Sequence, residues 1–471
     1  MKMQRNPLQH NLADWLRENG RSPNWTLWGA HASGSLNILM TGTALGGRLA
    51  DLAGRSVLVA TDDQLTAAIS LIELDGVARR LILCPPGVAP AHLPAIVTDA
   101  EVDAIVSDRA APEYDALDIG LRVQCFPDIR PTENTVPRSH QTEWILLTSG
   151  TSGAPKAVVH NLASLTAAIK PRDHAGPPIV WATFYDIRRY GGLQIFLRAV
   201  LGGSSLVLSD GKEPVGEFLA RLRARGATHI TGTPSHWRRV LWSPAAASIA
   251  PQYARMSGEV ADQAIIDSLR ATYPQAKVGH AYASTEAGVG FHVDDAREGF
   301  PASFLGTRRD GVEIKVEEGS LRVRSAGTAA RYLGPGRGTV AGEDGFVDTG
   351  DLIMMCGDRC YFAGRASGVI NVGGSKVHPE EVEAVINRHP DVRMSLVRSK
   401  KNPITGSVVV ADVVLADAPT DNDTEMRKSA VKHEIIQLCR ESLTQYKVPV
   451  VISFVPSLAI AESGKIARHH A

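Results

Sequence analysis

The chain has 471 residues, 44% of them hydrophobic and 21% charged, and its 50 Lys and Arg residues equal its 50 Asp and Glu residues. A formal net charge of zero gives no reason to expect nucleic acid or a membrane surface as a partner. The N-terminus lacks the apolar core of a signal peptide. The longest apolar run, 448–461, is broken by Pro449 and Pro456 and is too short for a membrane span. Five scattered cysteines indicate a reduced, cytoplasmic setting, and the length predicts more than one domain.

The first part of the chain alternates short apolar strands with helical patterns. Such alternation predicts an α/β fold, in which a parallel sheet is covered by helices on both faces. Residues 113–143 contain three prolines and are predicted to form a loop. The expected helices are 12–17, a Gly/Ala-rich segment through 49, 63–74 and 88–100, and the expected strands are 56–60, 79–85 and 103–108.

An apolar strand, 144–147, leads into a loop that is rich in Ser, Thr and Gly, and Lys156 follows. The loop consists of Thr148, Ser149, Gly150, Thr151, Ser152 and Gly153. Glycines let backbone N–H groups turn inward, hydroxyls add donors and the lysine adds charge, so the loop fits a phosphate. The alternative is a flexible hairpin turn. A Walker loop is excluded, because no glycine precedes the lysine and Ala157 follows it. The segment after Lys156 has helical spacing.

The stretch 144–160 closely resembles the phosphate loop of the adenylate-forming (ANL) superfamily. That superfamily includes acyl- and aryl-CoA ligases, luciferases and the adenylation domains of peptide synthetases. Its further motifs follow in the same order, so the resemblance covers the chain, although residues 1–110 match only in general pattern. The matching segments are 228–235, 257–260, 279–288, 345–352, 364–383 and 463–468.

The resemblance implies nucleotide-binding roles for residues from several motifs. Tyr282 offers a ring face to adenine, Thr285 a hydroxyl to the α-phosphate, and Glu286 a hard oxygen to Mg2+. Asp351 would accept from both ribose hydroxyls, and Arg365 would reach the ribose or a phosphate. The alternatives are a helix cap at Thr285 and an Asx turn at Asp351. The same role is implied for the 148–153 loop, Lys156, Gly258, Glu259, Val260, Ala283 and Ser284.

The resemblance also implies a pocket for the carboxylic acid. Tyr185, Asp186 and Ala281 are expected to face this substrate. A buried carboxylate needs a cationic or donor partner, so Asp186 indicates an amine-bearing acid. The alternative is that Asp186 pairs with Arg188 or Arg189 and does not contact the substrate. A modest polar pocket of this kind suits aromatic or amine-bearing acids better than long alkyl chains.

A domain boundary is implied directly after Arg365. Residues 1–365 are expected to bind ATP and the carboxylate and to include a small antiparallel sheet, and residues 366–471 to form a mobile α+β domain. The hinge would be Ser367, and Gly374 would lie in a turn that enters the site for the second half-reaction. Lys465 would swing in to meet the carboxylate and the α-phosphate, unless it is a solvated tail lysine. The expected strands here are 312–317, 320–325, 394–398 and 407–415, and the expected helices begin at 379 and span 424–442.

The resemblance as a whole implies an AMP-forming acid–thiol ligase. A carboxylic acid attacks the α-phosphate of ATP, pyrophosphate leaves, and the CoA thiol takes the acyl group from the adenylate. Lys465, Glu286 and Thr285 are the expected catalytic residues, Glu286 is the expected metal ligand, and ATP, Mg2+ and CoA are the expected small molecules. One alternative passes the acyl group to a carrier-protein thiol or an amine, and another is a non-catalytic nucleotide-binding protein. The segment 372–383 favours CoA, and the oligomeric state is left open.

Overall fold

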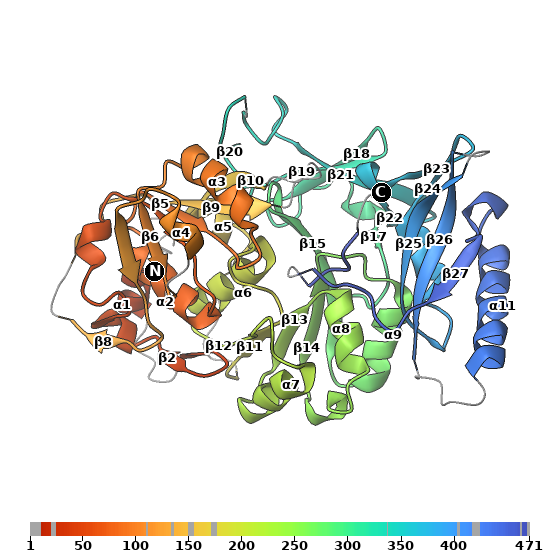
Figure 1. The fold of residues 1–471 in the computed structure, drawn as a ribbon, viewed down its shortest axis with the longest axis horizontal. Coiled ribbons are helices and arrows are strands. Elements are labelled where there is room, and N and C mark those ends of the chain that lie inside the picture. The colour runs from red at the N-terminus through yellow and green to blue at the C-terminus, as the bar shows by residue number, and fades with distance from the viewer. Residues whose placement is uncertain are drawn as a thin grey trace.

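The computed structural model describes residues 11–19, 25–109, 112–132, 136–148, 155–170, 177–336, 338–402, 406–416, 424–461 and 464–468. The fold is mixed α/β, as predicted, with two large and mainly parallel sheets, a separate antiparallel sheet and a small C-terminal α+β part. In Figure 1 the N-terminal part lies on the left and the C-terminal part on the right. Within these ranges, no helix is long and apolar enough to cross a membrane.

The eight-stranded sheet carries many of the residues that the motifs single out. Its order is β16-β15-β14-β13-β11-β12-β1-β2, and its strands are parallel from β15 to β1, with antiparallel strands at both edges. Helices α7 (Val215–Ala224), α8 (Pro234–Leu241) and α9 (Gln263–Thr272) pack on one face around the fully buried Trp237. The strands are β1 (Thr26–Trp28), β2 (Ser33–Ser35), β11 (Val180–Thr183), β12 (Ser205–Leu208), β13 (His229–Gly232), β14 (Tyr253–Ser257), β15 (Lys277–Ser284) and β16 (Gly288–Val293).

The seven-stranded sheet has the order β20-β10-β9-β5-β4-β6-β7 and is parallel from β9 to β7. Helices α2 (Gln64–Leu74) and α6 (Tyr190–Leu201) share one hydrophobic cluster with residues of both large sheets, so they join the two sheets into one core. Helices α3 (Leu93–Asp99) and α4 (Pro112–Asp115) lie over the other face. The strands are β4 (Ser56–Val59), β5 (Arg80–Leu83), β6 (Ala104–Ser107), β7 (Leu121–Gln124), β9 (Glu143–Thr148), β10 (Lys156–Asn161) and β20 (Arg331–Tyr332).

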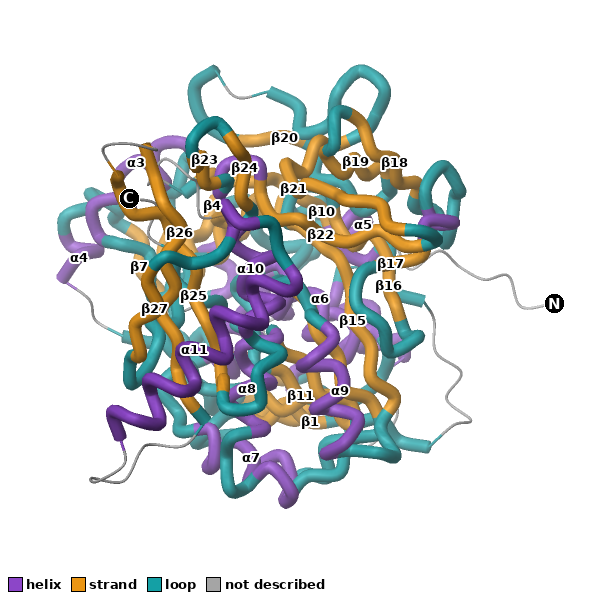
Figure 2. Tube along the Cα trace, turned by 90° about the vertical axis from the view of Figure 1, so that its right-hand side faces the viewer, coloured by secondary structure: helices purple, strands orange, loops and turns teal. Residues whose placement is uncertain are grey.

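An antiparallel sheet of order β17-β22-β21-β19-β18 leads into the C-terminal part. That part has its own hydrophobic cluster, drawn from residues 370–454. Figures 1 and 2 show its helices beside β25–β27 at the end of the molecule. The elements are β17 (Phe300–Pro301), β18 (Glu313–Glu317), β19 (Ser320–Arg324), β21 (Val347–Cys356), β22 (Arg359–Arg365), β23 (Ile370–Val372), β24 (Ser375–Val377), α10 (Pro379–Ile386), β25 (Val392–Asn402), β26 (Gly406–Leu415), α11 (Thr424–Ser442) and β27 (Val451–Phe454).

Three segments differ from the prediction. Helix α1 (Leu12–Asn19) forms, but the Gly/Ala-rich segment after it forms short strands and turns, because Gly46 and Gly47 adopt positive φ angles of 59° and 82°. After Lys156 the chain forms strand β10, whose four central residues are buried against β9 and its neighbours, and helix α5 (Leu162–Thr166) begins only afterwards. The predicted loop at 113–143 contains β7 and β8 (Arg130–Pro131), the latter paired with β3 (Gly42–Thr43).

The turn that carries Tyr185 and Asp186 fits tightly against the start of α6, at Gly192. A Cβ atom at Gly192 would lie 2.2 Å from the carbonyl oxygen of Asp186, whereas one at Gly191 would lie 3.8 Å from the nearest atom, in the Tyr185 ring. We therefore expect Gly192→Ala to destabilise the protein by about 1–3 kcal/mol, because the backbone of this turn must move. Gly191→Ala is the matched control. Equal midpoints for both variants in urea unfolding, followed by tryptophan fluorescence, would contradict the expectation.

Candidate active site

Residues predicted to bind the nucleotide meet between β15, β21 and β22. The Tyr282 hydroxyl donates to Asp351 Oδ2 (2.6 Å), and the Arg365 guanidinium donates to Asp351 Oδ1 (3.0 Å). The Tyr282 ring is nearly parallel to the ring of Phe362, with centroids 5.2 Å apart. Burial and the Asp351 charge raise the pKa of Tyr282, so its hydroxyl stays protonated. Asp351 is thus held by two donors, within a strand and not in an Asx turn.

The C-terminal segment crosses to the carboxyl ends of β13 and β14, as Figure 1 shows. Thr233 Oγ1 donates to the carbonyl oxygen of Gly464 (2.7 Å), and the backbone N–H of Ile466 donates to Glu259 Oε1 (3.0 Å). The other oxygen of Glu259 accepts from the backbone N–H of Ser235 at the start of α8 (3.0 Å). Glu259 therefore fastens the segment that carries Lys465, and both of its oxygens are engaged.

Two glycines make this crossing possible. Gly464 lies so close to the His236 ring that a Cβ atom there would be 1.9 Å from Cε1. Gly258 has a φ of 88°, and a Cβ atom there would be 3.3 Å from Cε of Lys465. Any side chain at Gly464 would displace the segment from α8, and one at Gly258 would crowd the lysine.

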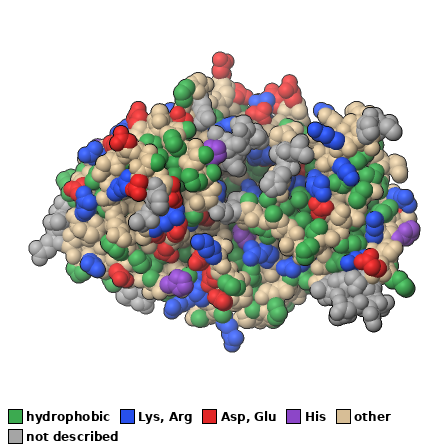
Figure 3. Space-filling view, viewed as in Figure 1, with side chains coloured by type: hydrophobic (Ala, Val, Ile, Leu, Met, Phe, Trp, Pro, Cys, Tyr) green, Lys and Arg blue, Asp and Glu red, His purple; other side chains and the backbone are tan. Residues whose placement is uncertain are grey.

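Lys465 projects into a recess that it shares with Asp351, Arg365 and Glu259. Its side chain is accessible, although protein surrounds it. Partial removal from bulk water lowers the pKa of Lys465, and Glu259 and Asp351 oppose that effect. Figure 3 shows that this face of the molecule is hollowed near its centre, with Lys and Arg side chains around the hollow. Asp351 and Glu259 are already hydrogen-bonded, so Lys465 and Arg365 are the groups in the recess that can neutralise a negatively charged ligand.

A second anchor holds the same segment to the C-terminal part. The Arg468 guanidinium donates to both carboxylate oxygens of Glu383 on α10, at 3.0 and 2.6 Å. Burial raises the pKa of Glu383 to about 7, and Arg468 counteracts this rise. Lys465 is therefore held at Gly464 by Thr233, at Ile466 by Glu259 and, further along the segment, at Arg468 by Glu383.

The predicted phosphate loop is only partly described. Thr148 ends β9 and lies opposite Lys156, the first residue of β10, and the Lys156 ammonium lies 5.7 Å from the centre of the Tyr332 ring. The loop residues Ser149, Gly150, Thr151, Ser152 and Gly153 lie outside the described residues. The loop thus connects two antiparallel strands, and Lys156 stands exposed at its end.

Thr285 and Glu286 occupy the turn between β15 and β16, so the helix cap considered for Thr285 is wrong. The turn is fixed by Ser284, whose hydroxyl accepts from the backbone N–H of Ala287 (3.0 Å). His160 on β10 donates to the carbonyl oxygen of Thr285 (2.7 Å), and burial lowers the pKa of His160 to about 4. A neutral histidine thereby ties the phosphate-loop strand to the Thr285–Glu286 turn, a link that the sequence did not indicate.

The carboxylate of Glu286 makes no hydrogen bond or ion pair with any described residue. Although burial lowers the pKa of Arg365, the nearby Asp351, Tyr282 and Glu286 together raise it. Ala283 lies at an irregularity of the β15–β16 pairing, and Val260 follows Glu259, half-buried. Glu286 is therefore an open, hard oxygen donor beside the recess.

The structure corrects one expectation about the acid pocket. Both carboxylate oxygens of Asp186 accept from Arg188, at 2.8 and 2.9 Å, which is the alternative considered above. Arg188 also donates to the carbonyl oxygens of Thr61 and Asp62. Asp186 is thus already neutralised by an arginine that bridges to the seven-stranded sheet, and it offers no free charge to a substrate ammonium.

The other two acid-pocket candidates lie close to the end of β14. The Tyr185 hydroxyl lies 2.5 Å from the carbonyl oxygen of Gly232 and 3.0 Å from that of Ser257. Ala281 on β15 is buried between Ser257 on β14 and His292 on β16, its two register partners. Tyr185 and Ala281 therefore belong to one face of the eight-stranded sheet, at the end near Gly258.

The hinge and turn candidates follow β22 and lie at the start of the C-terminal part. Ser367 is exposed in a short 3-10 turn, Ala366–Gly368, directly after β22. Gly374 has a φ of 88° in the turn between β23 and β24, and no atom lies within 4 Å of the position that its Cβ would take. In this structure Lys465 occupies the recess and the Gly374 turn does not.

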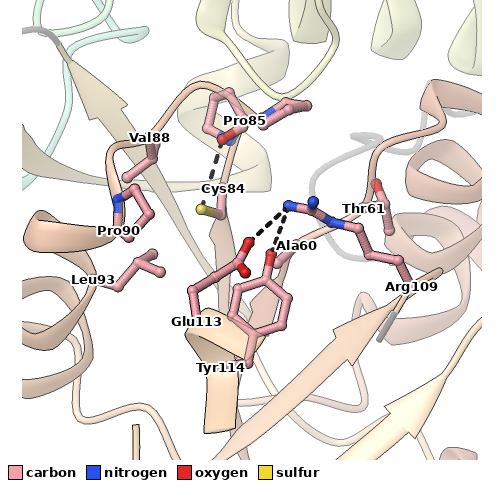
Figure 4. A pocket seen from close by; sticks show the side chains of 11 residues that line it. Ala60, Thr61, Cys84, Pro85, Val88, Pro90, Leu93, Arg109, Glu113 and Tyr114 are labelled. Atoms are coloured by element: carbon pink, nitrogen blue, oxygen red, sulfur yellow. Dashed lines mark hydrogen bonds and ion pairs between the residues drawn. The ribbon is translucent and has the colours of Figure 1, made fainter. Parts of the chain in front are cut away.

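A separate small cavity of about 130 Å3 lies at the carboxyl ends of β4, β5 and β6 (Figure 4). Arg109 there approaches Glu113 (3.3 Å) and the Tyr114 hydroxyl (3.5 Å). Burial raises the pKa of Cys84 to about 12, so this thiol is protonated and a poor nucleophile. None of the residues that line this cavity coincides with a predicted site residue, and the recess at Lys465 is the better candidate for chemistry.

Comparison with known proteins agrees with this geometry. The profile of the AMP-binding enzyme family matches residues 51–333, and that of the AMP-binding enzyme C-terminal domain matches residues 381–465. The chain is 26% identical to a 2-succinylbenzoate–CoA ligase of Bacillus licheniformis, over 69% of this chain and 68% of that protein. It is 24% identical to 4-coumarate–CoA ligase 3 of Oryza sativa subsp. japonica, over 80% and 69% of the two chains.

Solved structures share the fold over nearly the whole length. The anthranilate CoA ligase AuaEII, in complex with anthranoyl-AMP, aligns with a TM-score of 0.80 at 18% identity, covering 99% of this chain and 97% of that one. The amide bond synthetase McbA from Marinactinospora thermotolerans aligns with a TM-score of 0.76 at 20% identity, covering 97% and 98%.

Because Glu259 holds the segment 464–468 through the Ile466 N–H, the local stability of that segment should depend on Glu259. Glu259→Ala leaves the Ile466 N–H without its acceptor, which costs about 1–3 kcal/mol, and protection of residues 464–468 against hydrogen exchange should fall about tenfold or more. Hydrogen–deuterium exchange of the C-terminal peptide measures this. Glu425→Ala, on the exposed side of α11, should change nothing there. Unchanged exchange in Glu259→Ala would show that the segment is held by other contacts.

Proposed function

Because the chain belongs to the AMP-binding enzyme family, we propose that it activates a carboxylic acid with ATP and transfers the acyl group to the thiol of CoA. One observation carries the proposal: Lys465 is fastened into the recess that holds Tyr282, Asp351 and Arg365. The CoA ligases among the relatives support an AMP-forming acid–CoA ligase.

The chemistry of the first step explains the charge of the recess. A carboxylate must approach the α-phosphate of ATP, and two anions repel each other unless the site neutralises them. Lys465 stands at the point where the acid side and the nucleotide side meet, so it stabilises the charge that develops as pyrophosphate leaves. Arg365 adds a second positive charge on the nucleotide side.

We assign the nucleotide to residues on both sides of the β15–β16 turn. The Tyr282 ring offers a face to adenine, Asp351 accepts from the ribose hydroxyls, and Thr285 donates to the α-phosphate. The 148–153 loop and Lys156 hold the outer phosphates. The edge of adenine lies along Gly258, Glu259 and Val260, with Ala283 and Ser284 completing the wall.

Mg2+ fits this arrangement at Glu286. Its carboxylate is half-buried and unpartnered by any described residue, and a hard oxygen beside a triphosphate is the donor that Mg2+ prefers. Bound there, the ion would neutralise phosphate charge. Each residue would then have a separate role. Glu286 would hold the ion, Thr285 would bind the α-phosphate, and Lys465 would bind the reacting carboxylate.

The second step needs a rearrangement of the C-terminal part, which we propose begins at residue 366. Ser367 and Gly368 form an exposed connection, and a small residue followed by glycine tolerates large torsional changes. Rotation about Ser367 would withdraw Lys465 and bring the Gly374 turn to the adenylate, where the thiol of CoA would take the acyl group and AMP would leave. A carrier-protein thiol or an amine is the alternative acceptor.

The two-step scheme makes Lys465 necessary for only one step. Lys465→Ala should lower the rate of adenylate formation by about 100-fold or more, as loss of a charge-stabilising group does, and spare thioester formation from preformed adenylate. The measurements are pyrophosphate release and, separately, thioester formation from a synthetic acyl adenylate and CoA. Lys212→Ala, at an exposed loop position, is the control. Equal loss of both steps would contradict the exchange of Lys465 for the Gly374 turn.

The proposed function itself is tested by pyrophosphate release with ATP and Mg2+ across a panel of aromatic and polar carboxylic acids, with and without CoA. We expect release with some acids and acceleration by CoA. Release that CoA does not change would point to a carrier protein or an amine as the acceptor. No release with any acid would leave a non-catalytic nucleotide-binding protein.

A further inference from the structure

Two arginines, Arg198 and Arg255, lie beneath the proposed acid pocket without a carboxylate partner. Arg255 on β14 is only 8% exposed, and Arg198 on α6 is half-buried. The Nε atoms of both are buried and make no hydrogen bond. Arg255 donates to His292 Nδ1 (3.0 Å), and Arg198 makes one long contact with the carbonyl oxygen of Ala168 (3.4 Å).

The acidic residues nearby are already paired with lysines. Asp294 pairs with Lys277 (2.7 Å), and Asp310 pairs with Lys170 (2.7 Å). Among the described residues, no carboxylate lies within ion-pair distance of Arg198 or Arg255. The buried positive charge of Arg255 is costly without a partner, and the half-buried Arg198 also has no carboxylate beside it, so the two arginines can bind an anion from outside the chain.

Their position relative to the acid pocket follows from strand and helix periodicity. Arg255 and Ser257 are two residues apart on β14, so their side chains share a face about 7 Å apart. His292 is the direct register partner of Ala281 and shares its face of the sheet. The residue paired with Arg255 on β15 is Gly279, and the position that a side chain would take there is filled by the Asp294 carboxylate, which accepts from the Tyr253 hydroxyl and pairs with Lys277.

Helix α6 places Arg198 on the same side of the proposed acid pocket as Arg255. Gly191, next to the Tyr185 ring, and Arg198 are seven residues apart, so they lie on one face of the helix about 10 Å apart along its axis. Two independent elements thus place a guanidinium on the same side as Tyr185 and Ala281, at a similar distance beyond them.

His292 helps to fix this arrangement. Partial removal from bulk water and the neighbouring charges of Arg255, Arg198, Lys170 and Lys277 lower the pKa of His292 to about 2. The neutral imidazole therefore accepts a hydrogen bond from Arg255 and leaves the guanidinium charge uncompensated.

We propose that the acid carries a second carboxylate at its far end, and that Arg198 and Arg255 bind it while the first carboxylate reacts. The proposal rests on the proposed function, because it assumes that the acid lies beside Tyr185 and Ala281. It assigns the substrate to dicarboxylic acids, with the far carboxylate bound between β14 and α6. An amine-bearing acid would instead meet two positive charges.

The experiment compares α,ω-dicarboxylic acids of increasing length, aliphatic and aromatic, with their monomethyl esters. In pyrophosphate release the best diacid should exceed its own ester in kcat/KM by about tenfold or more, as expected for a charge-assisted hydrogen bond. Because the far carboxylate is bound equally before and during reaction, the difference should lie in KM. An ester as good as its diacid at every length would overturn the proposal.

Arginine variants test whether Arg198 and Arg255 cause the preference for diacids over their esters. Arg255→Met and Arg198→Met should each reduce the diacid-to-ester ratio toward one while activity with the ester remains, and Arg255→Lys should retain part of it. Arg270→Met, on the exposed surface of α9, should leave the ratio unchanged. Equal loss with diacid and ester in Arg255→Met would mean that Arg255 only supports the fold.

Binding measurements separate this proposal from the proposed function. Calorimetric titration of the AMP-loaded protein with the same acids needs no turnover. Selective binding of diacids that Arg255→Met abolishes, without pyrophosphate release from any acid, would keep this site and reject the ligase. Pyrophosphate release without discrimination between diacid and ester would keep the ligase and reject this site.

Discussion

The carboxylate of Glu259 is the contact on which the arrangement of this site depends. It accepts one hydrogen bond from the start of α8 and one from Ile466, which lies 207 positions further along the chain. Through that second bond, the C-terminal segment passes over a part of the sheet that is far from it in sequence. Lys465 would otherwise be a lysine near the end of a chain. With this contact, the Thr233–Gly464 hydrogen bond and the Arg468–Glu383 pair in place, it becomes a member of the recess that contains Asp351 and Arg365.

The rest of the site is built on connections between layers. Helix α6 joins the two large sheets, and Arg188 extends that joint by binding Asp186 on one side and backbone carbonyl groups beyond β4 on the other. His160 connects β10 to the turn that holds Thr285 and Glu286. Strand β10 on one sheet is thereby tied to the turn on the other sheet that carries Glu286, and we propose that both serve one nucleotide.

Charge is distributed unevenly over the proposed acid pocket, and this distribution is informative about the substrate. Asp186 is neutralised by Arg188, so the acidic residue nearest to the pocket exerts little field on a ligand. Arg198 and Arg255 have no such compensation among the described residues. We therefore propose that this pocket, which the sequence suggested for an amine, instead accepts an additional negative charge.

Much of this could be predicted from the sequence. The order of the motifs indicated the superfamily, because each motif is a short local pattern whose chemistry depends on neighbouring residues. The fold class followed from the alternation of apolar strands with helices, and α11 was predicted at its observed limits. Local sequence patterns gave the wrong secondary structure where pairing with a neighbouring strand determines it. Val158 and Val159 lie in a strand because β9 is available beside them, and the spacing after Lys156 gave no sign of this.

By itself, then, the sequence determined which residues are available for adenylate chemistry and the fold that contains them. Only the tertiary structure decided which charges are compensated. Asp186 forms an ion pair with Arg188, and Glu259 accepts a hydrogen bond from the Ile466 N–H. Arg198 and Arg255 have no acidic partner among the residues described. The physical reason is that electrostatic partnership depends on distance through space, and residues that neutralise one another need not be close along the chain.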